Sequence, residues 1–175
     1  NMYYYPTCYS KISIKNMEER NFNGKVIYLG YAKERKDLLL QIYEYLEGNQ
    51  VSCDFCIPDL NMGNYEKIKQ NPMKYSEYLE YVKKSDVILE LQQEGAVGYT
   101  LRTWEAIVFE KKLITNNLFI KNAPFYNEEY IQVICCAQDI DIEWIKRDLP
   151  INYNYVNELS PYKFLKFIEE SSLCR

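Results

Sequence analysis

The chain of 175 residues contains no histidine. Histidine is the side chain whose ordinary pKa lies closest to neutral pH, and Ser–His–Asp and Cys–His catalytic systems depend on it. Enzymes of these two classes are therefore excluded. Any chemistry must come from carboxylates, cationic side chains, hydroxyls and backbone dipoles.

Several other features are missing from the sequence. There is no run of 18 apolar residues and no signal-peptide pattern, so we expect a cytoplasmic protein without a transmembrane segment. Attachment to the inner face of the membrane stays open. The net charge of −4 and pI near 5.1 do not favour binding to nucleic acid, and no nucleic-acid partner is predicted. We predict no divalent metal and no other cofactor.

The six cysteines form no zinc-binding pattern. Cys53 and Cys56 make one C-x-x-C, and Cys135 and Cys136 are adjacent. A structural zinc site normally requires two suitably spaced pairs, or one pair with histidines. Cys53 and Cys56 also lie in a predicted strand, where residues three apart point to opposite faces. We therefore expect buried, reduced, structural thiols.

Short apolar runs alternate with amphipathic segments along most of the chain. The predicted strands cover residues 25–31, 51–58, 86–92, 112–116 and 131–136. The predicted helices cover residues 34–49, 75–85, 100–110 and 160–173, the last with Ser160 as N-cap and Pro161 in its first position. Buried strands alternating with helices are typical of a parallel sheet covered on both faces.

The predicted fold class is therefore α/β, a single Rossmann-like domain with a mostly parallel sheet of about five strands and helices on both faces. A length of 175 residues suits one domain, and 47% hydrophobic residues suffice for an ordinary core. We assign residues 24–175 to this domain. Residues 1–23 are expected to form an N-terminal extension or interdomain segment.

Ligands of open parallel sheets bind beyond the carboxyl ends of the strands. Two loops, 30–35 and 93–100, lead from such ends into helices, whose N-termini attract anions. Neither loop carries the G-x-G-x-x-G fingerprint or a P-loop. Three glycines would let the backbone approach a ligand, and three cationic side chains could bind phosphate oxygens. These residues are Gly30, Gly95, Gly98, Lys33, Arg35 and Arg102.

Glu105 lies near the start of the predicted helix 100–110, at the edge of its apolar stripe. A carboxylate beside a phosphate site can accept both hydroxyls of a ribose. Alternatively, Glu105 interacts only with the helix dipole or pairs with Arg102 three residues earlier. The residues alone leave both interpretations open.

The segment "GYTLRTWEAIVFEKKLIT" (98–115) resembles the C-terminal nucleotide-binding domain of GT-B glycosyltransferases. In that family a glycine precedes a helix of the form L-x-x-E-A, which Glu105 and Ala106 match. With "FYNEEYIQVI" (125–134), "YYYPTCYS" (3–10) and "YLGYAKERKDLLLQI" (28–42), the chain resembles bacterial lipopolysaccharide and capsular polysaccharide biosynthesis proteins. The similarity covers most of the chain.

This resemblance implies a site for a nucleotide-diphosphate sugar, with Glu105 on the donor ribose and Arg35, supported by Lys33, stabilising the leaving diphosphate. The first glutamate of the family's E-x7-E motif is replaced by Val97, and Tyr31 stands where an arginine often follows the glycine. The loops and the resemblance together predict the following nucleotide-binding residues: Gly30, Arg35, Gly95, Gly98, Thr100, Arg102, Glu105, Thr115 and Asn116.

Sugar transfer in this family requires a second, N-terminal domain that holds the acceptor. We therefore expect the chain to bind the donor, and transfer to require a longer protein or a partner chain. A homodimer is an open alternative.

Two other interpretations remain. Nucleoside deoxyribosyltransferase-like and TIR-like domains use a glutamate near the end of a central strand to cleave a glycosyl bond, a role that Glu105 or Glu90 would take. A non-catalytic Rossmann-like interaction module would instead use the aromatic segment Tyr3–Tyr5 and the last helix to bind a partner.

Overall fold

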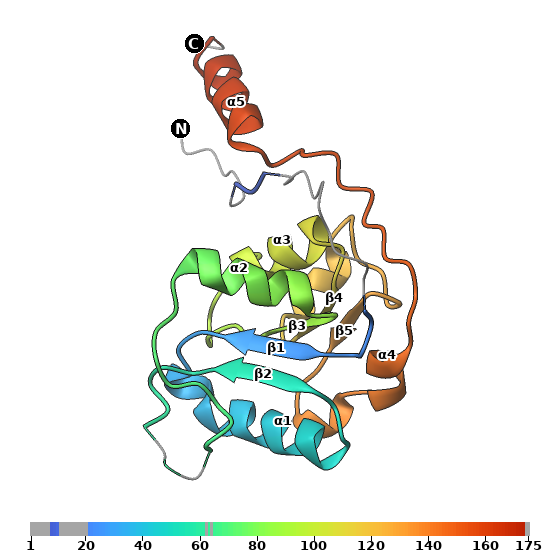
Figure 1. Cartoon of the computed structure of the whole chain (residues 1–175). Helices are drawn as coiled ribbons and strands as arrows, with labels where there is room; N and C mark the ends of the chain where they lie inside the picture. Colours follow the sequence, from blue (N-terminus) through green and yellow to red (C-terminus); the bar gives the residue numbers. More distant parts are fainter. Residues whose placement is uncertain (1–7, 11–20, 62, 64, 174–175) are drawn as a thin grey trace.

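The computed structural model describes residues 8–10, 21–61, 63 and 65–173 of the chain (Figure 1). The predicted aromatic segment Tyr3–Tyr5 and the sixth cysteine, Cys174, lie outside these residues. Within them, no helix is long and apolar enough to cross a membrane.

The core of the protein is a five-stranded parallel sheet, which confirms the predicted fold class. Its strands are β1 (Val26–Leu29), β2 (Cys53–Cys56), β3 (Val87–Glu90), β4 (Lys112–Thr115) and β5 (Ile131–Val133). All four neighbouring pairs are parallel, and the order is β2-β1-β3-β4-β5. This is the flavodoxin-like variant of the doubly wound fold, in which the direction of winding reverses between β1 and β3. A ligand site is therefore expected at the carboxyl ends of these two strands.

Helices cover both faces of the sheet (Figure 1). On one face lie α1 (Lys36–Gly48) and α4 (Ile142–Lys146), and on the other α2 (Tyr75–Lys84) and α3 (Leu101–Val108). Side chains alternate along β1, so Val26 and Tyr28 pack with α1, whereas Ile27 and Leu29 pack with α2 and α3. Short 3-10 helices at Lys33–Arg35, Leu118–Asn122 and Ala137–Asp139 complete the domain.

The last helix, α5 (Pro161–Leu173), stands apart from the sheet in Figure 1. It begins as predicted, because the Ser160 hydroxyl accepts a hydrogen bond from the backbone N–H of Lys163. Tyr162, Leu165 and Ile168 are exposed on it. Before it, the segment 153–159 runs back to the N-terminal residues, where the Tyr155 hydroxyl donates to the carbonyl of Tyr9.

Two consecutive lysines at the start of β4 fix helices on opposite faces of the sheet. The Nζ atom of Lys111 donates to the carbonyls of Lys83 and Ser85 at the end of α2. The Nζ atom of Lys112 donates to three carbonyls at the end of α4. Consecutive strand residues point to opposite faces, so this pair joins both helical layers to one strand. A cation at a helix C-terminus also interacts favourably with the helix dipole.

The five described cysteines are all free. Cys53 and Cys56 pack in the clusters on opposite faces of the sheet, as their spacing predicted. The expectation of buried thiols is confirmed for Cys56, but Cys8, Cys53 and Cys136 are only partly buried and Cys135 is exposed. Cys135 and Cys136 follow β5 in a surface turn, where both backbone N–H groups donate to the carboxylate of Asp139.

Candidate functional site

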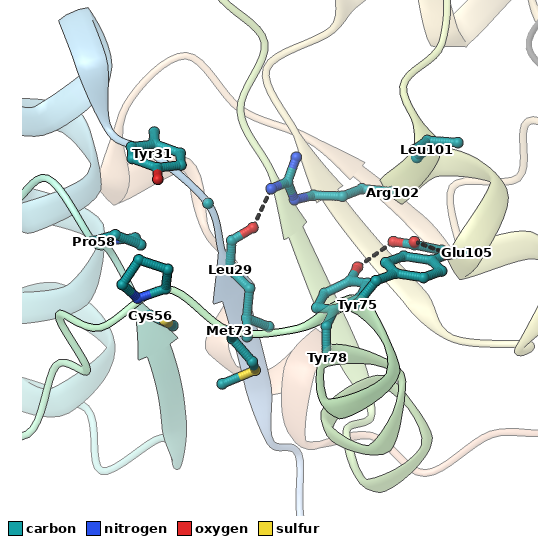
Figure 2. Close-up of a pocket in the computed structure, with 12 residues that line it drawn as sticks. Leu29, Tyr31, Cys56, Pro58, Met73, Tyr75, Tyr78, Leu101, Arg102 and Glu105 are labelled. Atoms are coloured by element: carbon teal, nitrogen blue, oxygen red, sulfur yellow. Dashed lines mark hydrogen bonds between the residues drawn. The ribbon is translucent and has the colours of Figure 1, made fainter.

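A cavity of about 350 Å³ opens at the carboxyl ends of β1 and β2, between α2 and α3 (Figure 2). Gly30 and Tyr31 line it after β1, Tyr75 and Tyr78 line it from α2, and α3 contributes Leu101, Arg102 and Glu105. Its walls are mainly apolar, and its charged groups are the Arg102 guanidinium and the Glu105 carboxylate. Apolar walls with few convergent polar groups are typical of small-molecule sites.

Glu105 is the buried anionic group of this cavity, with 1% of its surface exposed. Its Oε1 accepts a hydrogen bond from the Tyr75 hydroxyl at 3.0 Å, and its Oε2 accepts a short one from the Tyr78 hydroxyl. Burial raises the pKa of Glu105 above its ordinary value of 4.5, against the lowering effect of the two tyrosines and Arg102. A carboxylate with free acceptor positions in such a cavity can bind ligand hydroxyls.

A third tyrosine hydroxyl, that of Tyr9, contacts the Tyr75 hydroxyl. The hydroxyls of Tyr9 and Tyr75 lie 2.9 Å apart. Burial, as the largest cause, raises the pKa of both tyrosines. Tyr9 is buried and anchored by its backbone N–H, which donates to the carbonyl of Leu159. Tyr9, held by Leu159, therefore contacts the site through Tyr75.

Arg102 is the cation of the cavity. Its guanidinium donates a short hydrogen bond to the carbonyl of Leu29 and lies over the ring of Tyr28, 5.4 Å from the ring centre. Its Nε is buried and has no hydrogen-bond partner among the residues that the structure describes. Arg102 and Glu105 are one helical turn apart on α3, and both face the cavity (Figure 2). They therefore offer a ligand a cation and an acceptor side by side.

Because Gly30 has no side chain, the Arg102 guanidinium can lie directly against it. A Cβ atom at this position would collide with the terminal nitrogen of the Arg102 guanidinium, and the backbone φ of +157° is one that other residues rarely adopt. The glycine thus sets the position of a cation, in addition to allowing the chain to turn after β1.

The substitution Gly30→Ala is expected to displace the Arg102 guanidinium from the Leu29 carbonyl. Because the obstructed atom ends a flexible side chain, we expect a stability loss of only about 1–2 kcal/mol, mainly from the backbone strain. Affinity for a ligand that contacts Arg102, measured by calorimetry, should fall about tenfold, as expected when one charge-assisted contact is misplaced. Gly48→Ala, in open space at the end of α1, is the matched control. An unchanged affinity in Gly30→Ala would show that the position of Arg102 is irrelevant to binding.

Four of the predicted residues belong instead to internal polar networks. Glu90, at the end of β3, has no exposed surface and accepts hydrogen bonds from the hydroxyls of Thr100, Thr103 and Thr115. Thr100 also accepts from the backbone N–H of Arg102 and so caps α3. Thr100 and Thr115 therefore fix the start of α3 against β3 and β4. Their hydroxyls bond within the protein.

The second network joins the ends of β3 and β4. The side-chain amide of Asn116 accepts from the N–H of Gln92 and donates to its carbonyl. The carbonyl of Gly98 accepts from Gln92 and from Asn117. Asn116 and Gly98 thus hold the loop before α3 in place. Gly95 lies at the exposed tip of that loop, and no described atom lies within 4 Å of where its Cβ would be.

A carboxylate of the protein itself binds the backbone of the loop after β1. Asp59 accepts hydrogen bonds from the backbone N–H groups of Ala32 at 2.7 Å and Lys33 at 2.9 Å. Burial raises the pKa of Asp59, but these backbone bonds outweigh it and hold the pKa below its usual range. The N–H groups predicted to meet a phosphate therefore already have an anionic partner.

Arg35 lies between β1 and β3, where the winding reverses. Its guanidinium donates to the carbonyls of Tyr31, Ala32 and Leu91. It thus bridges the ends of the two strands through backbone oxygens. The side chain of Lys33 is in the exposed part of the same loop.

Of the predicted residues, the structure brings Gly30, Arg102 and Glu105 together in the cavity. Tyr75 and Tyr78 were missed, because 18 tyrosines in the chain made each of them look like a compositional bias. Their spacing of three within an amphipathic helix was the available signal. Asp59 and the structural role of Glu90 had no local signal, because their partners are distant in sequence.

No protein-family model matches the chain, and a search of curated proteins gives no match either. Within the described part of the chain, no three His, Cys, Asp or Glu side chains lie together as a metal site would require. The functional proposal therefore relies on the geometry of the cavity and on the motifs of the sequence.

Proposed function

We propose that the chain binds a nucleotide-diphosphate sugar, as the donor domain of a glycosyltransferase-like protein in bacterial cell-surface polysaccharide biosynthesis. The observation that carries this proposal is the buried Glu105 carboxylate, which faces a cavity at the carboxyl edge of the sheet. Doubly wound sheets bind ligands at this edge, and the cavity lies beside β1, one of the two strands between which the winding reverses, although β2 rather than β3 is the other strand that lines it. The resemblance of segment 98–115 to GT-B nucleotide-binding domains supplies the class of ligand.

In this proposal, Glu105 accepts the two ribose hydroxyls and the Arg102 guanidinium contacts the diphosphate. Guanidinium groups bind phosphate oxygens with charge-assisted hydrogen bonds. The exposed ring of Tyr31 and the side chain of Leu101 offer apolar surface for the base at the mouth of the cavity. Arg102, rather than the Arg35 expected from the sequence, makes the main diphosphate contact, because Arg35 is engaged with three carbonyls.

Transfer of the sugar would need an acceptor, held by a further domain or a partner chain. The contribution of this chain would be electrostatic, since Arg102 would stabilise negative charge on the departing diphosphate. We propose no metal ion for this step and no covalent intermediate on the chain.

Calorimetric titration of the chain with UDP, GDP, CMP, ADP and NAD tests the proposal. Saturable binding of one nucleoside diphosphate is expected, and its identity would name the base. Absence of binding by the whole panel to folded protein would reject nucleotide binding and favour the interaction module, with the exposed side of α5 as its contact surface.

A second function is favoured by one observation, the position of a buried glutamate in a mainly apolar cavity. In nucleoside deoxyribosyltransferase-like and TIR-like domains, such a glutamate attacks or stabilises the ribose carbon of a glycosyl bond. Incubation with NAD and with nucleosides distinguishes the two functions, because only glycosyl-bond cleavage releases nicotinamide or a free base. Release that depends on Glu105 would replace the donor-binding proposal.

A further inference from the structure

The Glu105 carboxylate has a donor on each of its two oxygens, and both donors come from α2. Tyr75 donates to Oε1 and Tyr78 to Oε2. A carboxylate oxygen has about two acceptor positions. Each oxygen therefore keeps one position for a further donor, and all three side chains line the cavity. Two neighbouring hydroxyls of a ligand match this pair of positions.

We propose that Tyr75 and Tyr78 are positioning residues, which hold the Glu105 carboxylate turned so that it selects ligands with two adjacent hydroxyls. This inference rests on the proposed nucleotide site and specifies its substrate class, ribonucleotides in preference to 2′-deoxyribonucleotides. The tyrosines act through Glu105 and need no contact with the ligand themselves.

Ring stacking favours this arrangement of the two tyrosines, of which Tyr75 is half exposed. They are three residues apart on α2, so they share one face of the helix. Their rings stack with centres 5.7 Å apart and an interplanar angle of 28°. Stacked rings on one helix face lose little further freedom when their hydroxyls bind a carboxylate, so the geometry is established before a ligand enters.

The direction of the hydrogen bonds follows from counting protons. A tyrosine hydroxyl has one proton, and an ionised carboxylate is only an acceptor. Tyr75 therefore gives its proton to Glu105, and Tyr9, 2.9 Å from Tyr75, gives its own to Tyr75. The Tyr9 hydroxyl contacts Tyr75 and not Glu105, so it supports the site indirectly.

The two tyrosine hydroxyls lower the pKa of Glu105. Burial is the largest influence and raises the pKa of Glu105, and the Glu90 carboxylate raises it further. The hydrogen bonds of Tyr78 and Tyr75 and the charge of Arg102 lower it. Loss of either hydroxyl should therefore raise the pKa of Glu105, because one donor to the charged form is removed.

Titration of the Glu105 carboxyl carbon by NMR, in the ligand-free protein, tests the positioning role directly. We expect the pKa to rise most in Tyr78→Phe, less in Tyr75→Phe and least in Tyr9→Phe. Tyr81→Phe on the same helix, whose hydroxyl bonds to Lys69, is the matched control and should leave the pKa unchanged. An unchanged pKa in both Tyr78→Phe and Tyr75→Phe would overturn the proposal.

Calorimetry with the pairs UDP and 2′-deoxy-UDP, and GDP and 2′-deoxy-GDP, tests the selectivity. The wild-type chain should prefer the ribonucleotide about tenfold or more, as expected for one lost hydrogen bond to a charged group. Tyr78→Phe should weaken ribonucleotide binding and reduce this ratio, whereas Tyr81→Phe should preserve both. Equal affinity of the wild-type chain for the members of each pair would overturn the selectivity.

The two experiments separate failure of this inference from failure of the proposed function. A chain that binds neither these four nucleotides nor CMP, ADP and NAD would reject the nucleotide site and the selectivity that depends on it. The NMR titration would still decide whether the tyrosines control the charge of Glu105. Substitution of tyrosine by phenylalanine preserves the ring packing, and the dispersion of the NMR spectrum reports whether each variant is folded.

Discussion

Glu105→Gln is expected to weaken nucleotide binding about 100-fold, the loss expected when two hydrogen bonds to a charged acceptor become weaker neutral ones. The glutamine preserves the size of the side chain and can still bond to Tyr75 and Tyr78, with its oxygen as acceptor and its amide as donor. Calorimetry with the nucleotide that the wild-type chain prefers measures the loss. Glu129→Gln, at an exposed position, is the matched control and should bind as the wild-type chain does.

The same substitution is expected to preserve or increase the stability of the fold at neutral pH. The pKa of Glu105 is raised in the folded protein, so the folded state binds more protons than the unfolded state between the ordinary and the raised value. The wild-type chain therefore loses stability as the pH rises through this window, whereas Glu105→Gln does not. Below the ordinary value of 4.5 both states are protonated and the difference disappears.

Urea unfolding of both proteins at acidic and neutral pH measures this difference. A loss of stability in Glu105→Gln at neutral pH would contradict the account, since it would mean that the charged carboxylate contributes to the fold. Combined loss of affinity and gain of stability is the pattern expected of a residue retained for binding.

Lys112→Met is expected to lower the free energy of unfolding by about 3–5 kcal/mol, because buried acceptors left without donors cost about 1–3 kcal/mol each. Lys112 has no exposed surface, and its Nζ donates to the carbonyls of Trp144, Ile145 and Arg147. Methionine fills most of the same volume but provides no donor. The loss is a large part of the 5–15 kcal/mol that stabilises a typical domain.

Urea unfolding also measures the effect of Lys112→Met. Lys121→Met, at an exposed position, should change the stability by less than about 0.5 kcal/mol. A loss below about 1 kcal/mol in Lys112→Met would show that the end of α4 is satisfied without the lysine. Because Lys112 lies far from the cavity residues in the fold, the folded fraction of this variant should bind nucleotide with unchanged affinity.

The periodicity of apolar residues predicted the five strands and four of the helices, because burial of a strand or a helix face is a local property of the sequence. It also placed Glu105 at the edge of the apolar stripe of α3, where the structure buries it. The five-residue helix α4 was not predicted, since it is too short to show a period and its visible signal is the single capping residue Asp141.

Contacts between distant segments could not be predicted in this way. Tyr78 and Glu105 are 27 positions apart in the sequence, and so are Asp59 and Ala32. Neither contact leaves a local pattern. The same applies to Arg35, whose role depends on the carbonyl of Leu91, 56 positions away. The sequence indicated which side chains carry charge at the carboxyl edge, but strand order and helix packing decide which of them face the cavity.

The most direct test of the central claim, that the cavity beside Glu105 is the nucleotide site, is amide chemical-shift mapping by NMR at a saturating concentration of the preferred nucleoside diphosphate. The account predicts that the largest shifts fall on Gly30, Tyr31, Arg102, Glu105 and Tyr78, the residues that line the cavity. Shifts confined to the Gly95–Gly98 loop or to α5, with none at these residues, would contradict it.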